Sequence, residues 1–139
     1  QLEIAAEMDL PIVFHNREAD EDIISILSDF PGLKGVAHCF SSTIETAEKL
    51  IELGFLISFS GNLTFKNSKL PEVASKISLR NLLVETDSPY LSPTPFRGKP
   101  NEPARVRYVA EKLAAINNCT LEEVAKRTSE NAIKLFKIV

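Results

Sequence analysis

Residues 35–61, GVAHCFSSTIETAEKLIELGFLISFSG, place a helical pattern between two short apolar runs. The runs GVAHC (35–39) and FLISFSG (55–61) are rich in branched and aromatic residues, as buried strands are. Between them, STIE at 42–45 is a capping box that opens a helix, and Gly54 is suited to end it. A strand, a helix and a second strand in this order predict two parallel strands.

The same alternation continues in both directions along the chain. Further strands are expected at PIVFH (11–15) and NLLVETD (81–87), and further helices at 1–9, 19–30, 69–77, from Asn101 to about Ile116, from Thr120, and near 129–137. Strand and helix therefore alternate at intervals of about 20 to 28 residues. The sequence predicts an α/β fold with four parallel strands, flanking helices and C-terminal helices.

Composition limits the kinds of protein that this chain can be. With 139 residues and 44% hydrophobic content, it can bury a core, and a single domain over 1–139 is expected. The formal net charge of -3 argues against general adsorption to nucleic acid or anionic membrane, so a polyanionic partner would need a local basic patch.

The sequence shows no membrane-spanning segment, signal peptide or disulfide pattern. No apolar run approaches the roughly 20 residues that span a bilayer, and the first residues lack the features of a signal peptide. Cys39 and Cys119 are far apart without a CxxC spacing, so both are expected as reduced thiols. We expect a soluble, cytoplasmic protein with no membrane partner.

Ionisable residues stand where the expected strands end. The chain has two histidines, of which His15 ends the first strand and His38 lies near the end of the second, while Asp87 ends the fourth. Carboxyl ends of parallel strands meet on the ligand-binding face, and imidazole and carboxylate are ligands of catalytic divalent cations. A partial metal site is predicted; the alternative is that each His is a satisfied polar residue at a strand end.

Two neighbours of these residues have different expected roles. Glu85 precedes Asp87 by two positions and shares its side of the strand, where it could orient a ligand histidine; pairing with a buried Arg or Lys is the alternative. Cys39 follows His38 and points away from it by strand alternation, so it is expected to pack rather than to bind metal.

Basic and aromatic residues follow the same strand ends and could contact a phosphate chain. The basic candidates are Arg17, Arg97, Lys99 and Arg105. Guanidinium groups there could grip phosphates, or each could be ordinary solvated surface charge. Phe40 and Tyr90 could stack on a base or pack the rim of the fold.

The chain resembles a known family. LPIVFHNREA, GVAHCFSS, FLISFSGNLTFKN, LLVETDSPYLSPTPFRGKPNEPARVRYVAEKLA and SENAIKLF occur in order and are similar to the second half of a TatD-type deoxyribonuclease, a metal-dependent hydrolase of the amidohydrolase type. ETDSPYL followed by RGKPNEPARV is far more specific than the pair of histidines.

The resemblance implies a fold, a reaction and a ligand set. The fold is a (β/α)8 TIM barrel of which residues 1–139 are a partial domain that lacks the first four strands. His15, His38 and Asp87 fall on metal-ligand positions, with Asp87 as the catalytic residue. The implied activity is hydrolysis of DNA phosphodiesters, including 3'-5' exonuclease action on single-stranded or nicked ends. The implied cofactor is a divalent ion, magnesium first, with zinc or manganese as alternatives.

The chain departs from the family pattern in one respect. The family's HxH pair on its first strand and its bridging Glu on the fourth have no counterpart here. A (β/α)8 barrel needs roughly 200 residues or more, so the missing amino-terminal half or another chain is expected to complete it. Alone, the chain is expected to bind metal weakly and turn over little. Two alternatives remain: a hydrolase of another ester or amide, such as D-aminoacyl-tRNA, and an inactive binding or assembly module.

Overall fold

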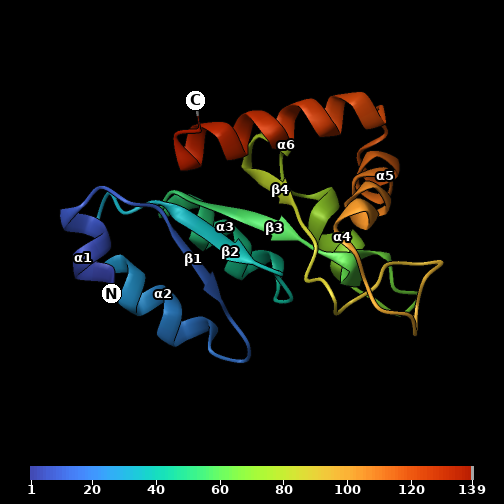
Figure 1. The fold of residues 1–139 in the computed structure, drawn as a ribbon. Coiled ribbons are helices and arrows are strands. Elements are labelled where there is room, and N and C mark those ends of the chain that lie inside the picture. Colours follow the sequence, from blue (N-terminus) through green and yellow to red (C-terminus); the bar gives the residue numbers. More distant parts are fainter. Residues whose placement is uncertain (139) are drawn as a thin grey trace.

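The computed structural model describes residues 1–138, which form one parallel sheet with flanking helices (Figure 1). The four strands are β1 (Ile12–His15), β2 (Gly35–His38), β3 (Phe55–Phe59) and β4 (Leu82–Val84). They lie in the order β1-β2-β3-β4, and each neighbouring pair is parallel. The predicted α/β class, with four parallel strands and flanking helices, is confirmed.

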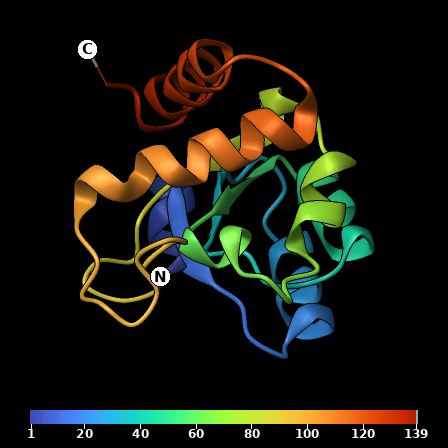
Figure 2. The same cartoon turned by 90° about the vertical axis from the view of Figure 1, so that its right-hand side faces the viewer.

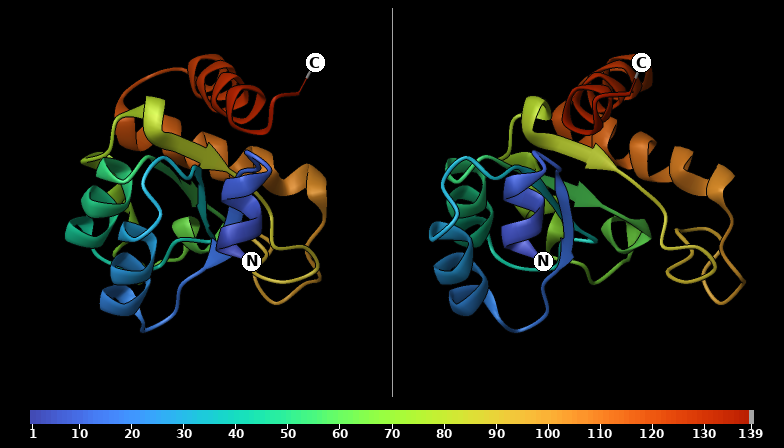
Figure 3. Two further views of the ribbon diagram at one scale, coloured as in Figure 1. Left: turned by 90° about the vertical axis from the view of Figure 1, so that its left-hand side faces the viewer. Right: turned by 60° about the vertical axis from the view of Figure 1, so that its left-hand side comes forward.

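Helices flank this sheet. They are α1 (Leu2–Glu7), α2 (Asp20–Ser28), α3 (Ile44–Glu52), α4 (Leu70–Ser75), α5 (Val106–Asn117) and α6 (Leu121–Phe136), with 3-10 turns η1 (Gly61–Thr64), η2 (Leu79–Asn81) and η3 (Pro103–Arg105). In Figure 1, α1 and α2 lie beside β1, whereas α5 and α6 lie toward β4. Figure 2 shows α5 crossing in front of the strands, and Figure 3 shows α6 beside β4.

The helix α3 begins one residue later than the capping box predicts. Thr43 is the N-cap, and its hydroxyl accepts a hydrogen bond from the Thr46 N–H at 3.4 Å. Ser42 instead donates its hydroxyl hydrogen to Asp20 at the start of α2. The predicted box at 42–45 was therefore wrong by one position, because Ser42 has a partner from another element.

The chain ends in one long helix rather than the two that were predicted. Thr120 caps α6 as expected, with its hydroxyl accepting from the Glu123 N–H at 3.1 Å. Val124 and Thr128 are buried on one face, and Asn131 continues that face by donating to the carbonyls of η2 and β4. The division near 129 was wrong because this inward face, with its spacing of four and then three residues, runs on without a break.

The third and fourth strands are shorter than predicted. β4 ends at Val84, although the Glu85 N–H still donates to the Phe59 carbonyl at 3.0 Å, so Asp87 lies in the following loop rather than at the strand end. β3 ends at Phe59, and Gly61 opens a 3-10 turn against the next loop. A Cβ at Gly61 would lie 1.8 Å from the Leu91 carbonyl oxygen, so only glycine lets these two segments approach.

The hydrophobic core lies between the sheet and its helices. Phe55, Ile57 and Phe59 of β3 point into it and are buried. On the outer strand β1, by contrast, Val13 is 59% exposed. The strand order leaves β1 as an edge of the sheet. Within residues 1–138, no helix has the length and apolar character needed to cross a membrane.

Candidate metal centre

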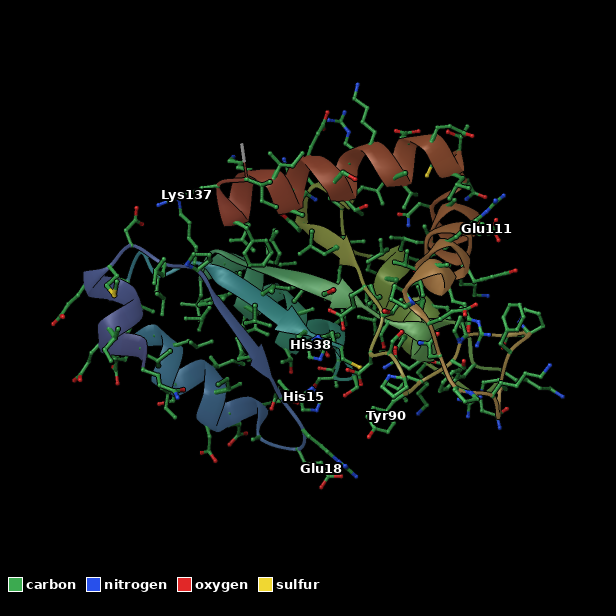
Figure 4. All side chains as sticks on the ribbon, viewed as in Figure 1. His15, Glu18, His38, Tyr90, Glu111 and Lys137 are labelled. Atoms are coloured by element: carbon green, nitrogen blue, oxygen red, sulfur yellow. The ribbon has the colours of Figure 1, made fainter. Side chains whose placement is uncertain are left out.

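His15 and His38 lie side by side at the carboxyl ends of neighbouring strands. They are the last residues of β1 and β2 and are paired directly in the parallel register. Their ring centroids are 6.0 Å apart, and Figure 4 shows both rings at the same end of the sheet. The register therefore brings together the two imidazoles that the sequence places at strand ends.

His38 lies between two carboxylates. Its Nδ1 is 2.7 Å from Glu85 Oε1, and its Nε2 is 3.5 Å from Asp87 Oδ1. The side chain of Glu85 is 20% exposed and that of Asp87 is 37% exposed. Glu85 thus contacts the imidazole on its more buried side, and Asp87 contacts it on its more solvent-exposed side. Glu85 and Asp87 contact different nitrogens of the same ring, both from the segment that follows β4.

The donor chemistry of this group fits a divalent cation. Two atoms bound to one ion at about 2.1 Å lie roughly 3.0 to 3.5 Å apart, which is close to the separation of His38 Nε2 and Asp87 Oδ1. A carboxylate on the other ring nitrogen, here Glu85, is the usual support of a metal-bound histidine. Residues 1–138 contain no cluster of three or more His, Cys, Asp or Glu side chains close enough to hold an ion. The arrangement is therefore an open set of donors, not a closed cage.

Glu85 has two further hydrogen-bond partners. Its Oε1 accepts from the Cys39 N–H at 3.0 Å, and its Oε2 accepts from the Ser58 hydroxyl at 2.6 Å. The expected alternative, a pair with a buried Arg or Lys, is absent among residues 1–138. Sequence reasoning missed Ser58. The available signal was a serine inside the otherwise apolar run FLISF.

The side chain of Cys39 packs beside Ser60 and Asn62. It is 4% exposed, and its Sγ lies 3.1 Å from the Ser60 hydroxyl oxygen. Burial raises the pKa of the Cys39 thiol, which disfavours the thiolate that a soft metal would bind. Cys39 therefore packs, as expected, although it follows β2 in a left-handed conformation and does not alternate within the strand.

Three of the basic candidates lie on exposed surface, but they do not converge on one point. Arg17 lines a cavity of about 700 Å³ formed by the loops that follow β1, β2 and β3. Arg97 reaches the edge of this cavity, because its guanidinium carbon is 3.6 Å from the ring centroid of Phe65, a lining residue. Lys99 is exposed on the proline-rich loop.

Arg105 is held within the structure instead. Its side chain is 13% exposed, and its guanidinium donates to the Ser92 hydroxyl at 2.9 Å and the Pro100 carbonyl at 2.6 Å. It also stacks on Phe96, 4.2 Å from the ring centroid. These contacts fasten the two ends of the proline-rich loop to each other.

The two aromatic candidates separate into core and surface. Phe40 is 3% exposed and packs edge-to-face on Phe59, with ring centroids 6.2 Å apart, so it belongs to the core and not to a stacking surface. Tyr90 is 71% exposed. Its N–H donates to the Asp87 carbonyl at 2.7 Å, and its carbonyl accepts from Asn101 at 2.8 Å. Figure 4 shows Tyr90 on the same side of the molecule as the histidines.

Comparison with known proteins identifies similar chains. The sequence model described as TatD related DNase matches residues 1–137. The chain is 47% identical to the uncharacterized metal-dependent hydrolase YabD of Bacillus subtilis, covering 99% of this chain and 55% of YabD. It is 46% identical to the uncharacterized metal-dependent hydrolase YcfH of Escherichia coli K12, covering 99% and 53%.

Solved structures agree with these sequence matches. The crystal structure of YjjV, a TatD homolog from Escherichia coli K12, superposes with a TM-score of 0.91 at 31% identity and covers 99% of this chain and 54% of YjjV. A TatD family hydrolase from Entamoeba histolytica, at 24% identity and a TM-score of 0.86, shares the fold; the match covers 97% of this chain and 54% of that protein. The chain spans about half the length of the curated relatives that it matches.

Proposed function

The chain belongs to the TatD-related DNase family, and from this membership we propose that it forms the carboxy-terminal half of a metal-dependent hydrolase that cleaves DNA phosphodiester bonds. The observation that carries the proposal is the position of Asp87 Oδ1, 3.5 Å from His38 Nε2, with His15 on the adjacent strand end. The relatives' names as metal-dependent hydrolases support the reaction class. DNA as the substrate, and 3'-5' removal of nucleotides from single-stranded or nicked ends, rest on the family resemblance.

The side chains at the strand ends have distinct roles in this proposal. His15, His38 and Asp87 would hold a divalent cation, proposed as magnesium, with zinc or manganese as alternatives. Such an ion supplies Lewis acidity, which favours ionisation of water and offsets the negative charge that develops on a phosphate in the transition state. Asp87 also offers a carboxylate oxygen that could accept a proton from the attacking water. Glu85 keeps the His38 ring in place from behind.

Substrate binding is assigned to groups around this centre. The chain has a net charge of -3, so attraction of a polyanion depends on local cations. Arg17 follows β1, Arg97 and Lys99 lie on the proline-rich loop that follows β4, and all three are exposed and could neutralise phosphates. Tyr90 presents a ring that could stack on a base. Arg105, also expected to grip phosphates, would act indirectly by holding the loop that carries Arg97 and Lys99.

We further propose that this chain supplies four strands of a (β/α)8 barrel, and that the amino-terminal half or another chain supplies the rest. The sheet has open edges, and exposed Val13 on β1 is an apolar side chain on one of them. The open donor set fits the same proposal, because an incomplete barrel would lack the ligands contributed by its other strands. Both cysteines are free, in keeping with the reducing cytoplasm as the proposed compartment.

The test is release of nucleotides from 3'-labelled single-stranded DNA by the full-length protein, with Mg²⁺, Mn²⁺ or Zn²⁺ added separately. Asp87→Asn should abolish release, whereas Asp29→Asn should not. Asp29 is an exposed carboxylate that follows α2 at the opposite end of the sheet, so it serves as a matched control. Residues 1–139 alone should release little. Absence of release with all three metals, together with hydrolysis of D-aminoacyl-tRNA, would replace DNA as the substrate.

A further inference from the structure

Ser58 is a buried polar residue in the middle of the sheet. It is 1% exposed on β3, between Ile57 and Phe59, which are both fully buried. A buried hydroxyl is unfavourable unless it is hydrogen-bonded, and that of Ser58 donates to Glu85 Oε2 at 2.6 Å. Ser58 pairs with Leu83 in the β3–β4 register, so Glu85 lies two residues farther along the same side. The register therefore determines this contact.

The other carboxylate oxygen of Glu85 is occupied as well. Glu85 Oε1 accepts from the Cys39 N–H at 3.0 Å and lies 2.7 Å from His38 Nδ1. Cys39 follows the end of β2 with a φ of +48°, a left-handed conformation that is uncommon for residues other than glycine. The donors reach the carboxylate from different segments of the chain, so they fix both its position and its plane.

This arrangement determines which nitrogen of His38 is free. A carboxylate only accepts hydrogen bonds, so the contact at 2.7 Å requires a proton on His38 Nδ1. In the neutral ring, Nε2 then carries the free lone pair, and it faces Asp87 at 3.5 Å. If Glu85 were free to rotate, both the tautomer and the orientation of the ring would be less restricted.

We propose that Ser58 is a positioning residue of the metal centre: by fixing Glu85, it holds His38 in the Nδ1–H tautomer with Nε2 directed toward the cation. The last step rests on the proposed function, whereas the effect on the tautomer does not. Removing a group that hydrogen-bonds to a metal ligand typically weakens metal affinity 10- to 100-fold. Ser58 does not contact the ligand His38 itself but bonds to Glu85, which does. The expected loss of affinity on removing its hydroxyl is therefore about tenfold.

The test compares Ser58→Ala with Ser60→Ala in residues 1–139. Ser60 is also buried, but its hydroxyl contacts Cys39 and Asn62 rather than Glu85, so it controls for loss of a buried hydroxyl. Long-range ¹⁵N–¹H spectra of the metal-free chain report the tautomer of each imidazole. With two histidines in the chain, His15→Gln assigns the signals. His38 should be the Nδ1–H tautomer in the wild type and Ser60→Ala, and a mixture in Ser58→Ala.

Calorimetric titration with Zn²⁺ provides the second measurement. Ser58→Ala should bind about tenfold more weakly than Ser60→Ala. An unchanged His38 tautomer in Ser58→Ala would overturn the proposal. If that variant does not fold, Ser58→Cys, of similar size with a weak S–H donor, should give an intermediate mixture of tautomers. If residues 1–139 bind no measurable metal but the tautomers shift as expected, the positioning of His38 stands, and the proposed function is decided separately by nucleotide release from the full-length protein.

Discussion

His15 and His38 pair directly across β1 and β2 but have different environments, because His15 is exposed while His38 is enclosed by Glu85 and Asp87. The pairing gives both imidazoles access to the same end of the sheet. The difference in surroundings means that the two residues should contribute unequally to stability even if both bind the same ion.

Replacing each histidine by alanine separates these contributions. Both variants should lower the affinity of residues 1–139 for Zn²⁺ in calorimetric titration, from a wild-type affinity that is already weak. His15→Ala should change the free energy of unfolding by less than about 0.5 kcal/mol, because the side chain is exposed. His38→Ala should cost about 1 to 3 kcal/mol, because Glu85 loses a partner. Equal destabilisation by the two variants would contradict the role assigned to Glu85.

Replacing Tyr90 by alanine should affect DNA binding, whereas replacing Phe40 by alanine should affect stability. Tyr90→Ala is expected to weaken binding of the full-length protein to oligo-dT by about 1 to 3 kcal/mol, the usual contribution of a stacked base, with little change in stability. Phe40→Ala should cost about 3 to 5 kcal/mol of unfolding free energy, because it leaves a cavity beside Phe59. Fluorescence anisotropy and urea unfolding measure the two quantities. Unchanged anisotropy for Tyr90→Ala would remove Tyr90 from the substrate surface.

Alanine variants of Arg105 and Arg107 test whether the contacts of Arg105 with Ser92 and Pro100 hold the proline-rich loop in place. Arg105→Ala should cost about 1 to 3 kcal/mol and increase proteolysis within 89–100, because it removes the bonds to Ser92 and Pro100. Arg107→Ala removes only an exposed pair with Glu111 on α5 and should leave the free energy of unfolding almost unchanged. Limited trypsin digestion followed by mass spectrometry measures the rate of cleavage within the loop. Similar digestion of both variants would mean that Arg105 does not hold it.

The exposed edge at Val13 should cause residues 1–139 to associate. Open strand edges with apolar side chains pair with other chains, so the apparent mass should rise with protein concentration. Val13→Lys places a charge on the edge and should keep the chain monomeric, whereas Ile133→Lys, which replaces an exposed apolar residue on α6, should not. Sedimentation velocity distinguishes the variants. A concentration-independent monomer in the wild type would show that this edge needs no partner.

The sequence predicted the parallel sheet and the positions of His15 and His38 because both depend on local patterns: apolar runs, breaks and strand ends. It did not predict Ser58, because the need for a buried hydroxyl arises from the register between β3 and β4, which brings Glu85 alongside. The expected phosphate contact of Arg105 illustrates the same limit. Whether the Arg105 guanidinium is solvated or bonds to Ser92 depends on the conformation of a long loop. Periodic sequence patterns predict helices and strands but not the conformation of such a loop.

The contact between Asp9 and Lys137 should make the stability of the chain depend slightly on pH in the acidic range. The Lys137 ammonium donates to Asp9, and this hydrogen bond and charge lower the pKa of the Asp9 carboxyl below its ordinary value of 3.8. A lowered pKa favours folding above the unfolded value, and this contribution is lost as pH falls through the folded pKa. Lys137→Ala should therefore flatten the decline of the thermal midpoint below pH 4, whereas Lys134→Ala, in the last turn of α6, should not. The pair is exposed, so the difference should be small, and an identical decline in both variants would show that the contact contributes nothing measurable.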